Sequence, residues 1–166
     1  MTLAQPLALH EDRVRPEWID FNGHMNIAYY MLAFDHATDA FFSRVGMLHE
    51  YREQHGQVFF TLELHVTYER ELVVDAPIRF TTQVLGLDAK RLHLFHTVVH
   101  ASEGYLAATN EIIFVNVDFA TRRSTPFLPA AYQALERIWS SHKDLPRPPQ
   151  AGRVIGIGRG RPSAGA

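Results

Sequence analysis

The sequence of 166 residues contains no cysteine. This absence excludes disulfide frameworks, thiol nucleophiles and cysteine-based zinc or iron–sulfur sites, and it is consistent with a reducing compartment. Long apolar runs are also missing, because no segment approaches the roughly 18 apolar residues that span a membrane. Residues 1–9 lack both the basic start and the apolar run of a secretory signal. We therefore expect a cytoplasmic protein with no membrane-spanning segment.

Several common catalytic motifs are absent as well. The sequence has no Gly-x-Ser-x-Gly elbow, no Walker phosphate loop and no dinucleotide-binding glycine pattern after a strand. His49-Glu50 does not form a zinc-protease motif, because the next histidine is His55. An excess of positive charge is missing too. The net charge is −2, and residues 143–166 alone carry +4, so that the rest carries −6. Such an acidic body predicts no nucleic-acid partner.

The composition is that of one folded domain with a tail. Hydrophobic residues make up 46% and charged residues 20% of the chain, which is typical of globular proteins. The length suits a single domain that buries its own core without disulfide or metal staples. From Pro146 onward the chain is rich in proline, glycine and arginine, which is typical of an extended or mobile segment. We therefore predict a domain over residues 1–145 and a tail over residues 146–166.

Residues 26–48 predict one long helix. Apolar residues recur there every three or four positions, which is the period of one helical face: Tyr30, Phe34, Ala37, Phe41, Val45 and Leu48. Leu32 and Phe42 widen this apolar surface, so we expect most sides of the helix to be buried. Asn22 or Asn26 could cap its N-terminus, because asparagine is among the preferred capping residues.

The remaining elements are mostly strands. Residues 58–69 alternate with a period of two, which predicts a strand with one apolar face formed by Val58, Phe60, Leu62, Leu64, Val66 and Tyr68. Further strands are predicted over 78–87, 91–101 and 105–117, with a first strand around 8–15 and a closing helix over 127–142. Short links make successive strands antiparallel neighbours. We therefore predict an α+β fold in which a meander, with about five strands in all, curls around the long central helix.

The densest group of polar side chains lies just before the long helix. Asp20, Asn22, His24 and Asn26 alternate there with apolar residues and Gly23. The start of a helix presents unpaired backbone N–H groups and a partial positive charge, which favour a carboxylate and can stabilise an oxyanion. The residues alone leave two interpretations open. The segment is either a catalytic loop or a capping loop in which Asp20 only satisfies the helix dipole.

Ten histidines raise the question of a metal site. His93, His96 and His100 share one predicted strand, but alternation places His96 and His100 on one face and His93 on the other. Three ligands cannot converge from that arrangement without a bulge. We therefore expect these histidines to face solvent or an interface, and we predict no metal site.

The polar segment resembles the signature of hotdog-fold thioesterases. Residues 20–26, Asp-Phe-Asn-Gly-His-Met-Asn, resemble the Asp-x-x-Gly-His-x-Asn sequence with which that family opens its central helix. Their Asp-x-Asn-x-His pattern also resembles a motif of plant acyl-carrier-protein thioesterases. Residues 68–71, Tyr-Glu-Arg-Glu, resemble a second family segment, and residues 16–18 and 152–153 resemble those of betainyl-CoA thioesterases. The predicted order of elements agrees with the family over roughly residues 8–142.

This resemblance implies a hotdog fold and hydrolysis of an acyl-CoA thioester without a metal or bound cofactor. Asp20 would attack the thioester carbon or activate water, and the backbone N–H near Ile27 would polarise the carbonyl. Asn22 and His24 match positions that orient substrate or water, and Glu71 matches a supporting position. Two alternatives remain. One is a dehydratase or hydratase of acyl thioesters with His24 as the base, and the other is a non-catalytic acyl-CoA-binding protein.

The resemblance also implies partners and substrate contacts. The family forms homodimers or homotetramers whose sheets join edge to edge, with active sites at the interface, and an open sheet has an edge strand that must be covered. Arg153, with Arg159 and Arg161, could contact the CoA phosphates. A betainyl group is a quaternary ammonium, which aromatic cages bind. The candidate cage residues, whose alternative role is packing, are Trp18, Phe21, Tyr29 and Tyr30.

Overall fold

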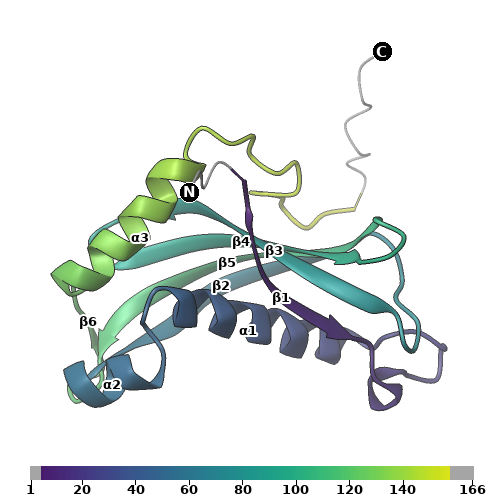
Figure 1. The fold of residues 1–166 in the computed structure, drawn as a ribbon, viewed down its shortest axis with the longest axis horizontal. Helices are drawn as coiled ribbons and strands as arrows, with labels where there is room; N and C mark the ends of the chain where they lie inside the picture. The colour runs from purple at the N-terminus through teal and green to yellow at the C-terminus, as the bar shows by residue number, and fades with distance from the viewer. Residues whose placement is uncertain (1–4, 158–166) are drawn as a thin grey trace.

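The computed structural model describes residues 5–157, which form a curled sheet around one long helix. The elements are β1 (Leu7–Arg13), a 3-10 turn η1 (Pro16–Trp18), α1 (Ile27–Arg44), α2 (His49–His55), β2 (Gln57–Tyr68), β3 (Pro77–Leu87), β4 (Arg91–His100), β5 (Leu106–Asp118), β6 (Arg123–Ser124) and α3 (Pro129–His142). Figure 1 shows α1 on one side of the sheet and α3 on the other. The predicted α+β architecture is confirmed. No helix within residues 5–157 is long and apolar enough to cross a membrane.

The strand order differs from the predicted meander. The antiparallel sheet runs β1-β3-β4-β5-β2, with β6 paired to β5 outside this path. Only β3, β4 and β5 form a meander, because β2 pairs with β5 rather than with its successor β3. Residues 69–76 carry the chain from β2, at one edge of the sheet, to β3, which lies next to the edge strand β1 on the other side. They pass the start of α1, where the N–H of Met25 donates to the carbonyl of Leu72 at 2.8 Å.

Helix α1 is shorter than predicted. It begins after Asn26, as expected, but ends at Arg44, and a separate helix α2 follows. Gly46 adopts a left-handed φ of 72°, and the N–H groups of Gly46 and Met47 donate back to the carbonyls of Ser43 and Phe42. This is the hydrogen-bond pattern of a Schellman cap, which ends a helix. The apolar spacing that continues through Leu48 therefore belongs to two elements rather than one.

One side of α1 is open, which the sequence did not predict. The inner side is buried against the sheet by residues such as Phe34 and Phe41. The opposite side is exposed at Asp35 and at Leu32, whose side chain keeps 40% of its surface accessible. The curled sheet therefore wraps only part of the helix and leaves an apolar position on the uncovered side.

A bulge in β2 changes which side chains face the core. The register with β5 shifts between Thr61 and Glu63. Before the shift Phe59 points inward and stacks on Phe42 of α1, with ring centroids 3.9 Å apart. After the shift Val66 packs on the core, so the inward-facing side chains change from odd-numbered to even-numbered residues. The predicted single apolar face is therefore wrong, because one extra residue rotates the strand. The apolar side chains that remain exposed on this edge strand are Phe60, Leu62, Leu64 and Tyr68.

Residues 146–157, the described part of the tail, contain no helix or strand and lie against the outer face of the sheet, as Figure 1 shows. The amide of Gln83 donates to the carbonyl of Pro146 at 3.4 Å, and the N–H of Gly152 donates to Glu111 at 2.6 Å. Arg147 pairs with the same Glu111 at 3.6 Å. An extended or mobile segment was predicted, whereas these anchoring contacts were not. Arg159 and Arg161 lie outside the described residues.

Candidate active site

The segment before α1 forms a tight turn that presents Asp20. The N–H of Gly23 donates to the carbonyl of Asp20 at 3.0 Å, and the N–H of Asp20 donates to the carbonyl of His24 at 3.1 Å. Gly23 has a φ of 83°, a conformation that a side chain would strain, so glycine suits this position. The tip of the turn places Phe21 almost wholly in solvent, at 98% exposure.

The Asp20 carboxylate is held by hydrogen bonds from two asparagines. Oδ1 accepts the backbone N–H of Asn22 at 2.8 Å, and Oδ2 accepts the side-chain amide of Asn26 at 3.2 Å. The backbone N–H of Asn22, the Asn26 amide and the nearby His24 lower the pKa of Asp20 below its ordinary value. Asp20 is therefore ionised at neutral pH and keeps lone pairs for a further partner.

Asn26, and not Asp20, caps α1. Its side-chain oxygen accepts the N–H of Ala28 at 2.9 Å, and its carbonyl accepts the N–H of Tyr29 at 3.0 Å. Asp20 therefore contacts the helix start through the capping residue Asn26 rather than as the N-cap itself. Within residues 5–157 no hydrogen bond uses the N–H of Ile27, the first residue of the helix. The Asp20 carboxylate, which accepts from the Asn26 side chain, and the unused N–H of Ile27, the residue after Asn26, therefore both lie at the start of α1.

His24 and Asn22 have different surroundings. The Nδ1 of His24 lies 3.3 Å from the carbonyl of Met25, so its Nδ1–H donates there. This contact leaves Nε2 of the half-buried ring for other partners. Asn22 contributes its backbone N–H to Asp20, while its side chain is exposed at the turn. His24 therefore keeps Nε2, and Asn22 keeps its side chain, available for a ligand beside Asp20.

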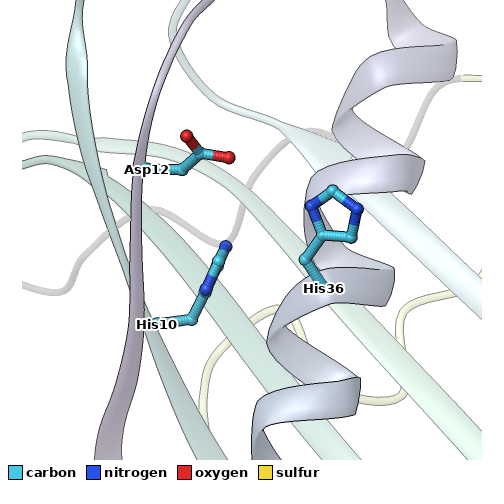
Figure 2. A group of neighbouring side chains, drawn as sticks. All are labelled: His10, Asp12 and His36. Atoms are coloured by element: carbon cyan, nitrogen blue, oxygen red, sulfur yellow. The ribbon is translucent and has the colours of Figure 1, made fainter.

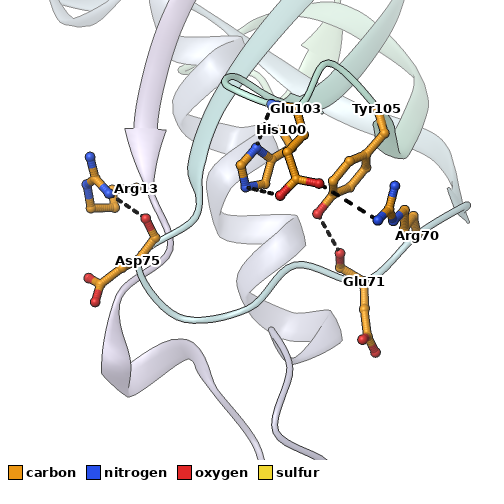
Figure 3. Close-up of polar contacts among 7 residues, drawn as sticks. All are labelled: Arg13, Arg70, Glu71, Asp75, His100, Glu103 and Tyr105. Atoms are coloured by element: carbon orange, nitrogen blue, oxygen red, sulfur yellow. Dashed lines mark hydrogen bonds and ion pairs between the residues drawn. The ribbon is translucent and has the colours of Figure 1, made fainter.

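Glu71 lies in the segment 69–76 that passes the start of α1. Its carbonyl accepts the hydroxyl of Tyr105 at 3.1 Å, while its exposed carboxylate points away from that group of contacts (Figure 3). The same segment is held by Arg13, which donates to the carbonyl of Asp75, and by an ion pair of Arg70 with Glu103 at 3.8 Å. These contacts fix the backbone on which Glu71 is placed.

The four candidate cage residues do not share one environment. Trp18 and Tyr30 are core residues, with 2% and 4% of their surfaces exposed. Tyr29 stacks on Trp18 with centroids 5.8 Å apart, and the Arg15 guanidinium lies 4.9 Å from the centre of the same indole ring. Phe21 points into solvent. Within a single chain these rings therefore form no cage, and only Phe21 and Tyr29 keep surface for a ligand.

Arg153 lies on the other side of the sheet from α1. It lines a cavity of about 560 Å³ between the tail and strands β2, β4 and β5, together with His65, His93 and Glu111. His93 is paired there with Glu111 at 2.9 Å. Arg153 is exposed, and within residues 5–157 it is the only one of the candidate substrate contacts on this face. The structure therefore separates it from the group around Asp20.

The strand histidines do not converge, as predicted, but the expected exposure is wrong for His96 and His100. His96 and His100 are buried on the inner face of β4, and His93 lies on the outer face. His96 is completely buried between the hydroxyls of Thr38 on α1, at 3.2 Å, and Thr82 on β3, at 2.9 Å. Sequence reasoning missed this polar group in the core, because its members lie far apart in the chain.

The fold and the groups at the start of α1 together define a class of protein. It is a single long helix wrapped by a curled sheet, with an ionised carboxylate and an unused N–H at the helix entrance. An anionic oxygen can take a proton from water or attack a carbonyl carbon, and a helix-terminal N–H can stabilise the oxyanion that forms. These two groups suit the cleavage of an activated carbonyl.

Comparison with known proteins agrees with this class. The family model of the thioesterase-like superfamily matches residues 14–135. A betainyl-CoA thioesterase from Pseudomonas aeruginosa is 37% identical over 155 residues, which cover 93% of this chain and 98% of that protein. An L-carnitine dehydrogenase/betainyl-CoA thioesterase from Agrobacterium fabrum is 34% identical, and the match covers 90% of this chain but 30% of that longer protein.

A solved structure shows the same fold. A Staphylococcus aureus protein in complex with CoA superimposes with a TM-score of 0.85 at 32% identity, covering 92% of this chain and 97% of that one. The chain therefore belongs to the thioesterase-like superfamily, and it is a thioester hydrolase with the hotdog fold.

Proposed function

We propose that this chain hydrolyses a small acyl-CoA to the free acid and CoA at the entrance of α1. The observation that carries the proposal is the arrangement around Asn26. This residue binds the Asp20 carboxylate with its side chain and precedes Ile27, whose N–H is unused within residues 5–157. The relatives named as acting on CoA thioesters and the relative solved with CoA support the substrate class.

The reaction follows from these two groups. Asp20 accepts a proton from water as the water oxygen attacks the thioester carbon, or its own oxygen attacks and water then cleaves the resulting anhydride. The N–H of Ile27 donates to the carbonyl oxygen as negative charge develops there. The carbon–sulfur bond breaks, and the CoA thiolate takes up a proton. Asn22 and His24 orient the substrate or water, Glu71 has a supporting role, and the reaction needs no cofactor.

The proposed acyl group is betainyl, by analogy with the named relatives. Its trimethylammonium has a neutral carbon isostere in the tert-butylacetyl thioester, which has the same shape without the charge. Aromatic contacts with a cation contribute about 0.5–2 kcal/mol. We expect kcat/KM for betainyl-CoA to exceed that for tert-butylacetyl-CoA by roughly tenfold, and Phe21→Leu to reduce this ratio.

Phe119→Leu is the matched control, because Phe119 is an exposed phenylalanine in the β5–β6 turn rather than in the Asp20 loop. It should leave the ratio unchanged. Equal kcat/KM values for the two thioesters would refute recognition of the cation, while leaving thioester hydrolysis itself intact.

We further propose that two chains pair along the edge strand β2. This strand has no neighbour on its outer side within residues 5–157, and it exposes apolar side chains including Phe60, Leu62 and Leu64. An uncovered apolar edge favours pairing with another chain. Pairing there would also bring a second chain toward the open Asp20 loop, consistent with an active site at the interface.

Leu64→Lys should therefore convert the dimer to a monomer and lower turnover at least about tenfold, because a buried lysine opposes association. Light scattering coupled to gel filtration measures the mass, and a thiol-release assay measures turnover. Ile157→Lys is the control, since Ile157 is exposed on the tail and does not line the cavity that contains Leu64 and Arg153. A Leu64→Lys variant that stays dimeric and active would contradict the proposed interface.

Arg153 is the proposed contact for the CoA phosphates, because guanidinium groups bind phosphate well. We expect Arg153→Ala to raise KM about three- to tenfold, more strongly at low ionic strength, with kcat retained. Arg44→Ala at the end of α1 is the control. An unchanged KM at low salt would show that Arg153, on the far face of the sheet, does not contact the substrate.

A further inference from the structure

Two histidines and an aspartate converge between the edge strand β1 and the central helix. His10 and Asp12 lie two residues apart on β1 and therefore point to the same side, toward α1. His36, from the third turn of α1, points back toward them (Figure 2). One potential ligand atom from each of the three side chains lies within 4.8 Å of the others. None of the three belongs to the group around Asp20.

A β-bulge places His10 in this position. The register between β1 and β3 shifts between Leu7 and His10, where β1 crosses the helix. The ring of His10 then lies 5.2 Å from that of Phe80 and 6.0 Å from that of His36, measured between centroids. This packing orients the imidazole between the strand and the helix and leaves little freedom for it to turn toward solvent.

The cluster contains an unexplained polar atom. Nε2 of His10 is buried and has no hydrogen-bond partner among the described residues. Such an atom is costly in a folded protein, and a water molecule or an ion usually accounts for it.

Asp12 is oriented as a ligand by its own neighbours. Its Oδ1 accepts the N–H of Arg13 at 2.8 Å, and its Oδ2 lies 3.4 Å from the guanidinium of Arg15. Contacts of this kind fix a ligating carboxylate in metal sites. Two imidazoles with one carboxylate favour a transition metal such as Zn²⁺, whereas Mg²⁺ and Ca²⁺ prefer sites made of oxygens alone.

We propose that His10, Asp12 and His36 bind one divalent transition-metal ion, for which Zn²⁺ is the best match. The ion would draw the three ligand atoms to about 2.0–2.2 Å from itself, which small side-chain rotations achieve, and water would complete the tetrahedral shell. Its effect would be to tie β1 to α1. Strand β1 is an edge strand that pairs only with β3 within residues 5–157, so a link to the helix fixes its free side.

Isothermal titration of the tag-free, chelator-treated protein with Zn²⁺ tests the site, with Co²⁺ absorption as the reporter of coordination. We expect one ion per chain and a rise in Tm of roughly 5 °C at saturation. His36→Gln and Asp12→Asn should each weaken binding at least about tenfold, because each removes a ligand. Neither variant removes a residue proposed to act in hydrolysis, so turnover should be retained.

His49→Gln is the matched control, because His49 is an exposed histidine at the start of α2. It should bind Zn²⁺ like the unchanged chain. The Tm of each variant, measured in chelator, shows whether the variant is folded. If His36→Gln does not fold, Asp12→Asn alone tests the site. Less than one ion per chain, or equal affinity in the folded ligand variants and the control, would overturn the proposed site.

Discussion

Replacing Asp20 with asparagine should lower kcat for thioester hydrolysis by roughly 10²–10⁴-fold, the usual effect of losing a general base. Asparagine keeps the shape of the side chain and can still accept the N–H of Asn22. It removes the negative charge and the basicity on which both proposed mechanisms depend. Stability should change little, because the cap of α1 is Asn26 and the contact at risk is one hydrogen bond from its amide.

Asp88→Asn is the matched control for this variant. Asp88 accepts the N–H of Lys90 in the β3–β4 turn, and its pKa is also lowered despite its partial burial, by hydrogen bonds from Lys90 and Arg91. It therefore repeats the local chemistry of Asp20 at a distance from the start of α1. We expect normal turnover from Asp88→Asn. Near-normal kcat in Asp20→Asn, with Tm preserved, would show that the proposed mechanism is wrong and would make His24 the next residue to test.

Stability should fall steeply as the pH drops below 6.5, because His96 is buried without charge. Complete burial lowers the pKa of His96 from 6.5 to about 3. The Thr38 hydroxyl donates to the carbonyl of Phe34, so it accepts the Nε2–H of His96, and Nδ1 accepts from Thr82. Between pH 6.5 and 3 the unfolded chain therefore binds a proton at this residue that the folded chain does not.

The sign of the effect follows from this difference. Stability is greatest above pH 6.5 and decreases by about 1.4 kcal/mol for each pH unit below it, to a loss of roughly 4–5 kcal/mol near pH 3. His10 and His142, whose pKa values burial also lowers, act in the same direction. Urea unfolding between pH 4.5 and 7.5 measures the slope before most carboxylates are protonated.

His96→Gln should make the dependence of the unfolding free energy on pH shallower, because the unfolded variant binds about one proton fewer in this pH range. This holds whatever the effect of the substitution on stability at pH 7.5. His49→Gln should leave the slope unchanged, because His49 is exposed. A slope that is the same in His96→Gln and in the unchanged chain would contradict the assignment of His96 as a neutral core residue.

Local sequence signals predicted most elements but not how they are connected. The capping residue Asn26, the β3–β4 turn and the positive φ of Gly104 all follow from preferences of neighbouring residues. The end of α1 carried a usable signal as well, since Gly46 is the kind of residue that terminates a helix. The pairing of β2 with β5 carried none, because it depends on where residues 69–76 pass the helix.

In the candidate site, too, local features could be predicted from the sequence and long-range contacts could not. The turn from Asp20 to Asn26 is local, so its residues could be named from the sequence, whereas the contacts of Asp20 with Asn22 and Asn26 required the structure. The bulge in β2 has no marker in the residues around Leu62. The polar core around His96 and the cluster of His10 with His36 join distant segments, and no pattern along the chain reports such contacts.

The release of CoA thiol from betainyl-CoA and a panel of short acyl-CoAs tests directly whether this chain hydrolyses acyl-CoA thioesters. The chain has no cysteine, so a thiol reagent reports only the CoA that is set free. We predict one free thiol for each molecule of acid formed, in a reaction that Asp20→Asn suppresses. Consumption of an enoyl-CoA without thiol release would identify a hydratase instead, and binding with neither reaction would identify a non-catalytic acyl-CoA-binding protein.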